Sequence, residues 1–213
     1  MAEKKQVSAA GIRIMRRPKI SFETDRLFIR SVVEEDKETY MSMRTPEDDT
    51  SATNSMLYGF RDILWEGELN SDNEAYVIVF RKEDDEPVAI GSFQKLNTST
   101  VELGFVVAER HRKQGIATEL LNGMLREVQE VLPGKAVRIC TRTTNTACRR
   151  VAEKCGGILS GHERGPASDA LASLLVSAEK RLPEDDGELK RLRKSVTSFI
   201  EENKEGICIY RFE

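Results

Sequence analysis

The chain has few of the residues that build metal centres or disulfide frameworks. Of its 213 residues only two are histidines and four are cysteines. The cysteines are Cys140, Cys148, Cys155 and Cys208, and they form no C-x-x-C pair. This composition argues against a zinc site or a set of disulfides and is typical of reduced thiols in the cytoplasm. We therefore expect a cytoplasmic protein without a bound metal.

Long apolar runs and an excess of one charge are also missing. No stretch approaches the length of a membrane span, and no secretory signal precedes the first predicted strand. Charged residues make up 32% of the chain but nearly balance, at a formal net charge of −3. That balance gives no general reason to expect binding to nucleic acid or to membranes. The length suits one domain with a substantial core.

The most informative stretch runs from Val101 to Val128. It begins with the alternation of a strand and passes through a basic loop over residues 109–114. From Gly115 onward its apolar residues recur at the spacing of a helix. Such a unit offers unpaired backbone N–H groups and the positive end of a helix dipole, which favour a phosphate-rich ligand. The alternative is a solvated basic loop that only caps a core helix.

The spacing within the loop is more specific than its charge. The loop reads Arg112-Lys113-Gln114-Gly115-Ile116-Ala117, which fits R-x-x-G-x-A. This spacing resembles the acyl-CoA pyrophosphate loop of the GNAT superfamily, the Gcn5-related N-acetyltransferases. It differs from the Rossmann spacing and lacks the Ser or Thr of a P-loop.

Two further stretches resemble the same family. Residues 24–30 fit T-x-R-L-x-x-R, the opening signature of the branch that contains the ribosomal-protein N-terminal acetyltransferases and the spermidine acetyltransferases. Residues 145–157 are similar to a second signature, N-x-x-S-x-x-x-Y-E-K-x-G-F. The matching positions there are Asn145, Glu153, Lys154 and Gly156. The departures are Cys148 for Ser, Ala152 for Tyr and Gly157 for Phe.

The resemblance implies the GNAT acyl-CoA N-acyltransferase fold. This is an α+β architecture with a mixed, mostly antiparallel seven-stranded sheet flanked by helices. The patterns predict strands over 24–30, 75–80, 88–96, 101–107, 137–141, 158–164 and 207–212. They predict helices from Glu34 onward, around 56–64, over 115–128 and over 147–154. Three antiparallel strands ahead of the loop–helix unit match the order of the family.

We expect a single domain over residues 21–213, preceded by a flexible basic arm over residues 1–20. A mitochondrial presequence is a minor alternative for the arm. Between the last two strands, residues 166–205 carry two amphipathic patterns that predict a helical hairpin insertion. The insertion could be a lid, a specificity wall, a dimer contact or a plain surface elaboration.

The resemblance also implies which residues contact acetyl-CoA. Backbone groups of Phe105, Val106 and Val107 would pair with the pantetheine arm. The pyrophosphate would lie on Arg112, Lys113, Gln114, Gly115, Ile116, Ala117 and Thr118, and Asn145 would contact the cofactor arm. His111 is expected to contact solvent or phosphate.

Acetyl transfer to an amine requires a base for the amine and an acid for the departing thiolate. Glu102 is the candidate base, since acids on this strand serve that role in several relatives. A solvated polar residue is the alternative for it. Cys148 could protonate the thiolate, because an ordinary thiol pKa is reasonably matched to that task. The Tyr often credited with this role in relatives is replaced by Ala152.

The resulting prediction is an N-acetyltransferase that uses acetyl-CoA and acts by direct attack of an amine within a ternary complex. We expect a protein N-terminus as the acceptor, and a polyamine or small amine is the alternative acceptor. A non-catalytic acyl-CoA-binding module and an interaction protein that binds through the insertion are the rivals from other classes. A homodimer is left open.

Overall fold

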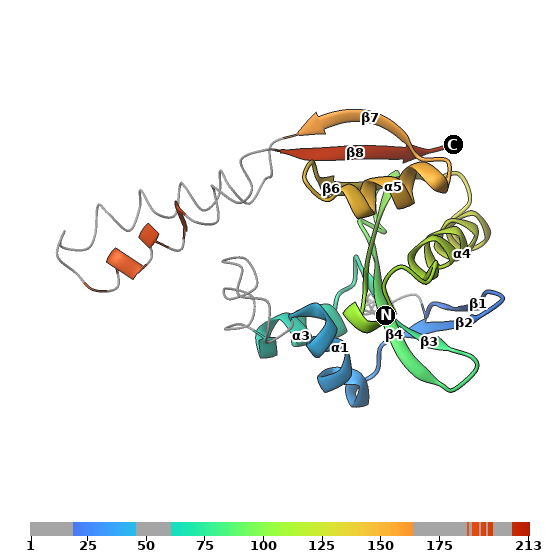
Figure 1. Cartoon of the computed structure of the whole chain (residues 1–213), viewed down its shortest axis with the longest axis horizontal. Coiled ribbons are helices and arrows are strands. Elements are labelled where there is room, and N and C mark those ends of the chain that lie inside the picture. Colours follow the sequence, from blue (N-terminus) through green and yellow to red (C-terminus); the bar gives the residue numbers. More distant parts are fainter. Residues whose placement is uncertain are drawn as a thin grey trace, which may run out of the picture.

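An eight-stranded mixed sheet organises the protein (Figure 1). The computed structural model describes residues 19–45, 61–163 and 206–213, together with separate positions between 187 and 197. The strands are β1 (Ser21–Glu23), β2 (Leu27–Ser31), β3 (Ala75–Arg81), β4 (Glu86–Gln94), β5 (Thr100–Val107), β6 (Ala136–Arg142), β7 (Ile158–Glu163) and β8 (Ile207–Phe212). The helices are α1 (Lys37–Arg44), α3 (Arg61–Leu69), α4 (Ile116–Val131) and α5 (Thr146–Lys154), with single 3-10 turns η1 (Glu34–Asp36) and η2 (Glu109–His111). The predicted fold class is confirmed.

The strand order is β1-β2-β3-β4-β5-β6-β8-β7. Among the described strands β5 and β6 pair in parallel, and the other neighbours are antiparallel. The sheet has one strand more than predicted, because Ser21–Glu23 forms a separate edge strand. Three residues are too few to show the alternation of a strand. The first predicted strand begins only at Leu27, and Thr24 and Arg26 lie in the turn before it.

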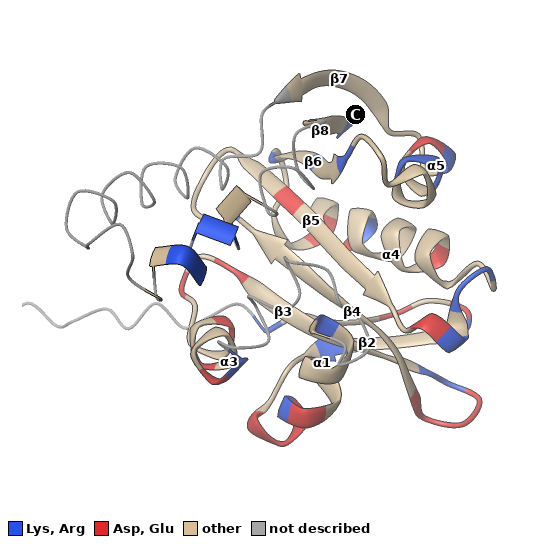
Figure 2. Ribbon diagram, turned by 60° about the vertical axis from the view of Figure 1, so that its left-hand side comes forward, with Lys and Arg blue, Asp and Glu red and all other residues tan. Residues whose placement is uncertain are grey.

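Two separate cores cover the two faces of the sheet. On one face α4 buries Leu120 and Met124 against strand residues such as Leu103, each at most 1% exposed. On the other face α1 and α3 bring together the rings of Tyr40 and Trp65, whose centroids lie 5.6 Å apart. Figure 2 shows β5 between α4 and the pair α1 and α3. Successive residues of β5 therefore face opposite cores.

Aromatic residues of β8 account for two departures from the second signature. Tyr210 packs beside Ala152 in a small buried cluster. A Cβ atom on Gly157 would lie 2.9 Å from Cζ of Phe212 and 2.8 Å from the carbonyl oxygen of Ala152. The ring of Phe212 leaves no room for a side chain at residue 157. β8 thus supplies aromatic bulk where the signature has its own Tyr and Phe.

Some predicted segments lie partly outside the described residues. Of the predicted flexible arm over residues 1–20, residues 1–18 lie outside the described residues. Ile20, at the end of the arm, is buried in the core under α4. The helix predicted around 56–64 is described only from Arg61, as α3. Most of the insertion over 166–205 also lies outside, but the positions described between 187 and 197 are helical, with Leu189 and Val196 buried. Among the described helices, none combines the length and the apolar character that crossing a membrane requires.

Candidate active site

Strands β5 and β6 pair only where they begin. The pairing runs from Thr100 with Ala136 to Glu102 with Arg138, and a cavity of about 530 Å³ opens beyond it. β4 follows β5 much further, to Val107, so the edge of β5 toward this cavity is open. The cavity is lined by Leu103, Gly104, Phe105, Ile139, Cys140, Thr141, Arg142, Thr144, Asn145 and Cys148. An open strand edge presents N–H and C=O groups to an extended ligand.

The predicted phosphate loop follows β5 directly and is tied to it. Nε of Arg112 donates to the carbonyl oxygen of Val107 at 3.3 Å. Nε2 of Gln114 donates to the carbonyl oxygen of Arg110 at 3.2 Å. Lys113 lies in the left-handed region with φ of +64°. That conformation is uncommon for a residue with a side chain and often marks a functional loop.

Helix α4 begins immediately after Gly115, whose φ is +82°. The first turn closes when Glu119 donates its N–H to the carbonyl oxygen of Gly115 at 3.1 Å. The N–H groups of Ile116, Ala117 and Thr118 therefore have no acceptor within the helix. They point out of the helix N-terminus, where an anion is favoured. The helix thus begins after Gly115, as the sequence predicts, and binding of a pyrophosphate by the loop stays a prediction.

Asn145 and Cys148 form the opposite side of the first cavity. Oδ1 of Asn145 accepts from the N–H of Cys148 at 3.0 Å and so caps α5. Burial raises the pKa of the Cys148 thiol, and a hydrogen bond with Thr141 only partly offsets it. The thiol is therefore protonated at neutral pH. The same burial makes Cys148 a weaker acid than an ordinary thiol, so its role as the proton donor to a leaving thiolate stays a prediction.

A second cavity, of about 200 Å³, lies on the other face of the sheet under α1. Its lining is Tyr40, Arg44, Ile90, Gly91, Ser92, Gln94, Gly104, Phe105 and Val106. Nε of Arg44 lies 3.3 Å from Oε1 of the buried Glu68. Burial, followed by the charge of Glu68, raises the pKa of Tyr40, whose hydroxyl stays neutral. The cavity thus combines neutral polar groups with a paired cation.

The two cavities meet at Gly104 and Phe105, which line both. A Cβ atom on Gly104 would lie 2.7 Å from Oγ of Ser92, so a side chain there would crowd Ser92, which also lines the second cavity. A ligand along the edge of β5 and a second ligand under α1 would therefore approach the same two residues. This arrangement suits transfer of a small group between two bound molecules.

Glu102 precedes this junction by two residues and faces the same side of β5 as Gly104. Its Oε2 lies 2.7 Å from Nζ of Lys95 and 2.9 Å from Nη2 of Arg138. Burial opposes ionisation of Glu102, but the hydrogen bonds and charges of these two cations outweigh it and hold the pKa below its ordinary 4.5. Glu102 is therefore ionised, with a reduced affinity for a proton. Its role as the base stays a prediction.

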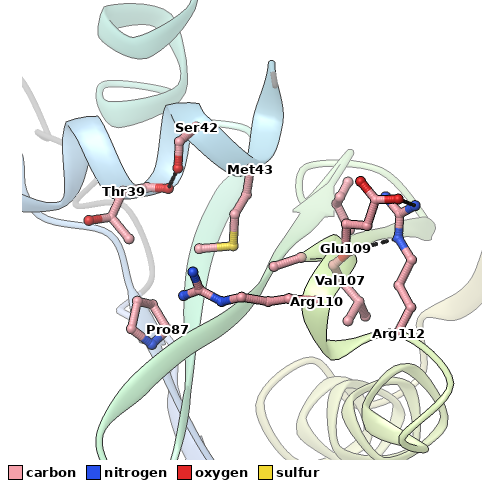
Figure 3. A pocket seen from close by; sticks show the side chains of 10 residues that line it. Thr39, Ser42, Met43, Pro87, Val107, Glu109, Arg110 and Arg112 are labelled. Carbon is pink, nitrogen blue, oxygen red and sulfur yellow. Dashed lines mark hydrogen bonds and ion pairs between the residues drawn. The ribbon is translucent and has the colours of Figure 1, made fainter. Parts of the chain in front are cut away.

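A basic groove of about 540 Å³ runs between α1 and the end of β5 (Figure 3). The side chain of Arg110 extends toward Met43 and Pro87, and its Nη2 lies 2.8 Å from Oε1 of Glu86. His111, predicted to contact solvent or phosphate, is only 5% exposed. Its Nε2 accepts from Nε of Arg110 at 2.9 Å, so it supports the loop from inside. Within the described part of the chain, no cluster of three His, Cys, Asp or Glu side chains could hold a metal ion.

A family model described as an acetyltransferase (GNAT) domain matches residues 14–158, more than half of the chain. This chain belongs to the GNAT acetyltransferases. Proteins of this family use acetyl-CoA, and the open edge of β5, the loop at 112–118 and the two neighbouring cavities lie within the matched region. A comparison with curated proteins found no match.

Solved structures show the same GNAT fold at low sequence identity. An acetyltransferase from Bacillus anthracis matches with a TM-score of 0.62 at 16% identity, covering 91% of this chain and 98% of that one. A chimera of the Vibrio cholerae spermidine N-acetyltransferase SpeG and hSSAT matches with a TM-score of 0.62 at 12% identity, covering 88% and 95%. A proposed ribosomal-protein-serine acetyltransferase from Vibrio cholerae matches with a TM-score of 0.59 at 13% identity, covering 92% and 98%. Identities this low establish the fold and leave the acceptor open.

Proposed function

We propose that this protein transfers the acetyl group of acetyl-CoA to a primary amine, and that the amine is the N-terminus of a protein. The observation that supports this most is the junction of the two cavities at Gly104 and Phe105. One cavity adjoins the open edge of β5, and the other opens under α1. Donor and acceptor can therefore bind together, which direct attack requires.

Each chemical requirement of the transfer has a candidate group. The open edge at Phe105, Val106 and Val107 would hold the pantetheine arm and offer an N–H to the carbonyl oxygen as negative charge develops there. Glu102 would accept the proton of the amine through a water, since it faces the acceptor side of β5. The protonated thiol of Cys148 would supply the proton to the leaving thiolate.

The charges around the second cavity favour an N-terminal amine over a polyamine. Arg44 lines the cavity and neutralises Glu68, so the described part of the pocket carries no uncompensated acid from that pair. A polyamine brings several positive charges, and the compensated pair of Arg44 and Glu68 offers them no net negative charge. An N-terminal amine is followed by a peptide carbonyl, and a guanidinium can donate to that oxygen. Arg44 therefore supports a peptide acceptor.

Polyamine acetylation is the second candidate function. One of the structural neighbours named above is a chimera of a spermidine N-acetyltransferase, and the hydroxyl of Tyr76 donates to Glu74 on the same face as Glu68. A displaced Arg44 would leave acids on this face to bind a cationic chain. A non-catalytic acyl-CoA-binding role remains the rival from another class. The cytoplasmic location and a homodimer also stay predictions.

The test is acetyl-CoA turnover, followed by thiol release, on matched acceptors. We would compare peptides with a free N-terminus, the same peptides with a blocked N-terminus and no lysine, spermidine, and a small monoamine. We expect turnover with the free peptides and none with the blocked ones. Preference for spermidine would select the second candidate. Binding of acetyl-CoA without turnover of any amine would select the non-catalytic role.

A further inference from the structure

The turn between β1 and β2 reaches the phosphate loop through one side chain. Nε of Arg26 donates to Oε2 of Glu119 at 2.7 Å, and Nη1 donates to the carbonyl oxygen of Gln114 at 3.2 Å. Its Nη2 would lie 3.4 Å from a Cβ atom on Gly115. The guanidinium thus lies against two consecutive residues of the loop. It is 54% exposed, so it also faces the solvent from which a phosphate would arrive.

Glu119 explains why a cation is needed at this place. It lies in the first turn of α4, where the helix dipole and the free N–H groups favour an anionic ligand. An unpaired carboxylate there would occupy that field and repel a pyrophosphate. Besides the bond from Nε, Oε1 of Glu119 accepts from the backbone N–H of Arg26 at 2.8 Å and from Oγ1 of Thr24 at 2.6 Å. Thr24 and Arg26 therefore hold the carboxylate of Glu119 in place, and the guanidinium of Arg26 neutralises its charge.

These contacts give a physical meaning to the opening signature T-x-R-L. Thr24 also accepts from the N–H of Leu27 at 3.1 Å, which fixes the turn that presents Arg26. The signature and the R-x-x-G-x-A loop are far apart in sequence and meet in the structure. A turn that served only to join two strands would not need to bond the loop.

We propose that Arg26 is a positioning residue for the pyrophosphate of the acyl-CoA donor. It holds the backbone at Gln114 and Gly115 in the binding conformation and cancels the charge of Glu119. This inference rests on the proposed function only for the identity of the donor. It concerns binding of the pyrophosphate, so it can be tested without an acceptor.

The experiment compares the binding of CoA with that of pantetheine, which lacks the pyrophosphate, by calorimetry. For Arg26→Ala we expect CoA to bind about tenfold more weakly, as for the loss of a charge-assisted contact. Pantetheine should bind the variant and the wild type alike. In Arg26→Ala with Glu119→Gln, CoA binding should recover most of the loss, because the repelling charge is gone. Arg126→Ala, an exposed cation further along α4, is the matched control and should change nothing.

Three results would overturn the inference. Equal weakening of CoA and pantetheine in Arg26→Ala would indicate a general structural defect. Failure of the double variant to recover would refute cancellation of the Glu119 charge as the cause of the loss. Unchanged CoA binding would show that Arg26 has no part in the site. If the wild type binds CoA but turns over no amine, the proposed function fails and the comparison still decides the role of Arg26. If the wild type binds no CoA, both proposals fail.

Discussion

At the scale of single residues, Glu102 has two possible roles, as the catalytic base and as a link between strands β5 and β6. A base must be ionised, and the charges of Lys95 and Arg138 ensure that. The same charges lower its pKa, so it accepts a proton less readily than a free carboxylate. Glu102 also lies at the last pair of the β5–β6 ladder, where it joins the two strands that enclose the cavity. Catalysis and strand pairing are therefore both available to this residue.

Replacing Glu102 with Gln separates these roles. If Glu102 is the base, kcat should fall by more than about a hundredfold, because general base catalysis contributes at least that much. In the wild type its ionisation should not limit kcat/KM above pH 4.5, since the folded pKa lies below that ordinary value. The measurement is a pH profile of kcat/KM for both proteins, with the dissociation constant of CoA.

A loss of CoA affinity with kcat nearly intact would contradict the role of base. It would assign Glu102 to the geometry of the strands instead. Arg138→Gln provides the comparison, because it removes the ion pair between β6 and Glu102 of β5 and keeps the carboxylate of Glu102. A catalytic carboxylate predicts that Glu102→Gln is far more damaging than Arg138→Gln.

At the scale of elements, the packing of α4 on β1 is controlled by Gly123. A Cβ atom there would lie 2.8 Å from Cε2 of Phe22 and from Cγ2 of Thr24. Gly123→Ala should therefore destabilise the protein by about 1–3 kcal/mol through overpacking, although Ala is the better helix former. Urea denaturation measures the change. Gly67→Ala in α3 is the control, since no atom lies within 4 Å of its Cβ position, and it should stabilise by up to about 1 kcal/mol.

A stabilised Gly123→Ala would show that α4 can shift away from β1 without cost. The consequence would extend to the site, because Thr24 also bonds Glu119 at the start of the same helix. Close approach at Gly123 and the contacts of the turn thus set the position of α4 together. Packing therefore locates helix α4, which follows the predicted phosphate loop, and hydrogen bonds locate the N-terminus of this helix.

At the scale of the whole molecule, the sequence could predict what is local. The strand, loop and helix around Gly115 are adjacent in the chain. Their order and the predicted anion site at the start of the helix therefore follow from the periodicity of apolar residues and from the spacing of the loop residues. The last strand, over 207–212, was predicted with its observed bounds because its apolar run is short and isolated. The extra edge strand was missed because it has only three residues.

Contacts between distant residues could not be predicted in this way. Arg26 and Glu119 are 93 positions apart, and nothing in either local pattern pairs them. Arg44 and Glu68 likewise come from two helices, so the charge balance of the second cavity appears only in the fold. Arg26 had one signal, its place in a family signature, but the signature does not say what the residue contacts.

The stability of the whole fold at acid pH depends on carboxylates that are bound in the folded state. Asp36 is the clearest case, with Oδ2 2.6 Å from Nη1 of Arg30 and Oδ1 2.8 Å from Nη2. The N–H of Val33 also donates to Oδ2 at 2.8 Å. Burial opposes ionisation of Asp36, but these donors outweigh it and lower the pKa. Glu102 and Glu119 have lowered pKa values for similar reasons.

A lowered folded pKa means that the unfolded chain binds more protons as the pH falls. The contribution of Asp36 is therefore complete above its ordinary value of 3.8 and is lost as the pH falls through the folded value. We expect Asp36→Asn to cost about 1.5–3 kcal/mol at pH 7, the range for hydrogen bonds to a charged group. The cost should shrink toward pH 3, because Asp36 of the unfolded chain begins to bind a proton below its ordinary pKa of 3.8 and the advantage of the wild type declines. Urea denaturation at both pH values checks this, with Asp62→Asn as the exposed control, and a cost independent of pH would refute the charged pair as its source.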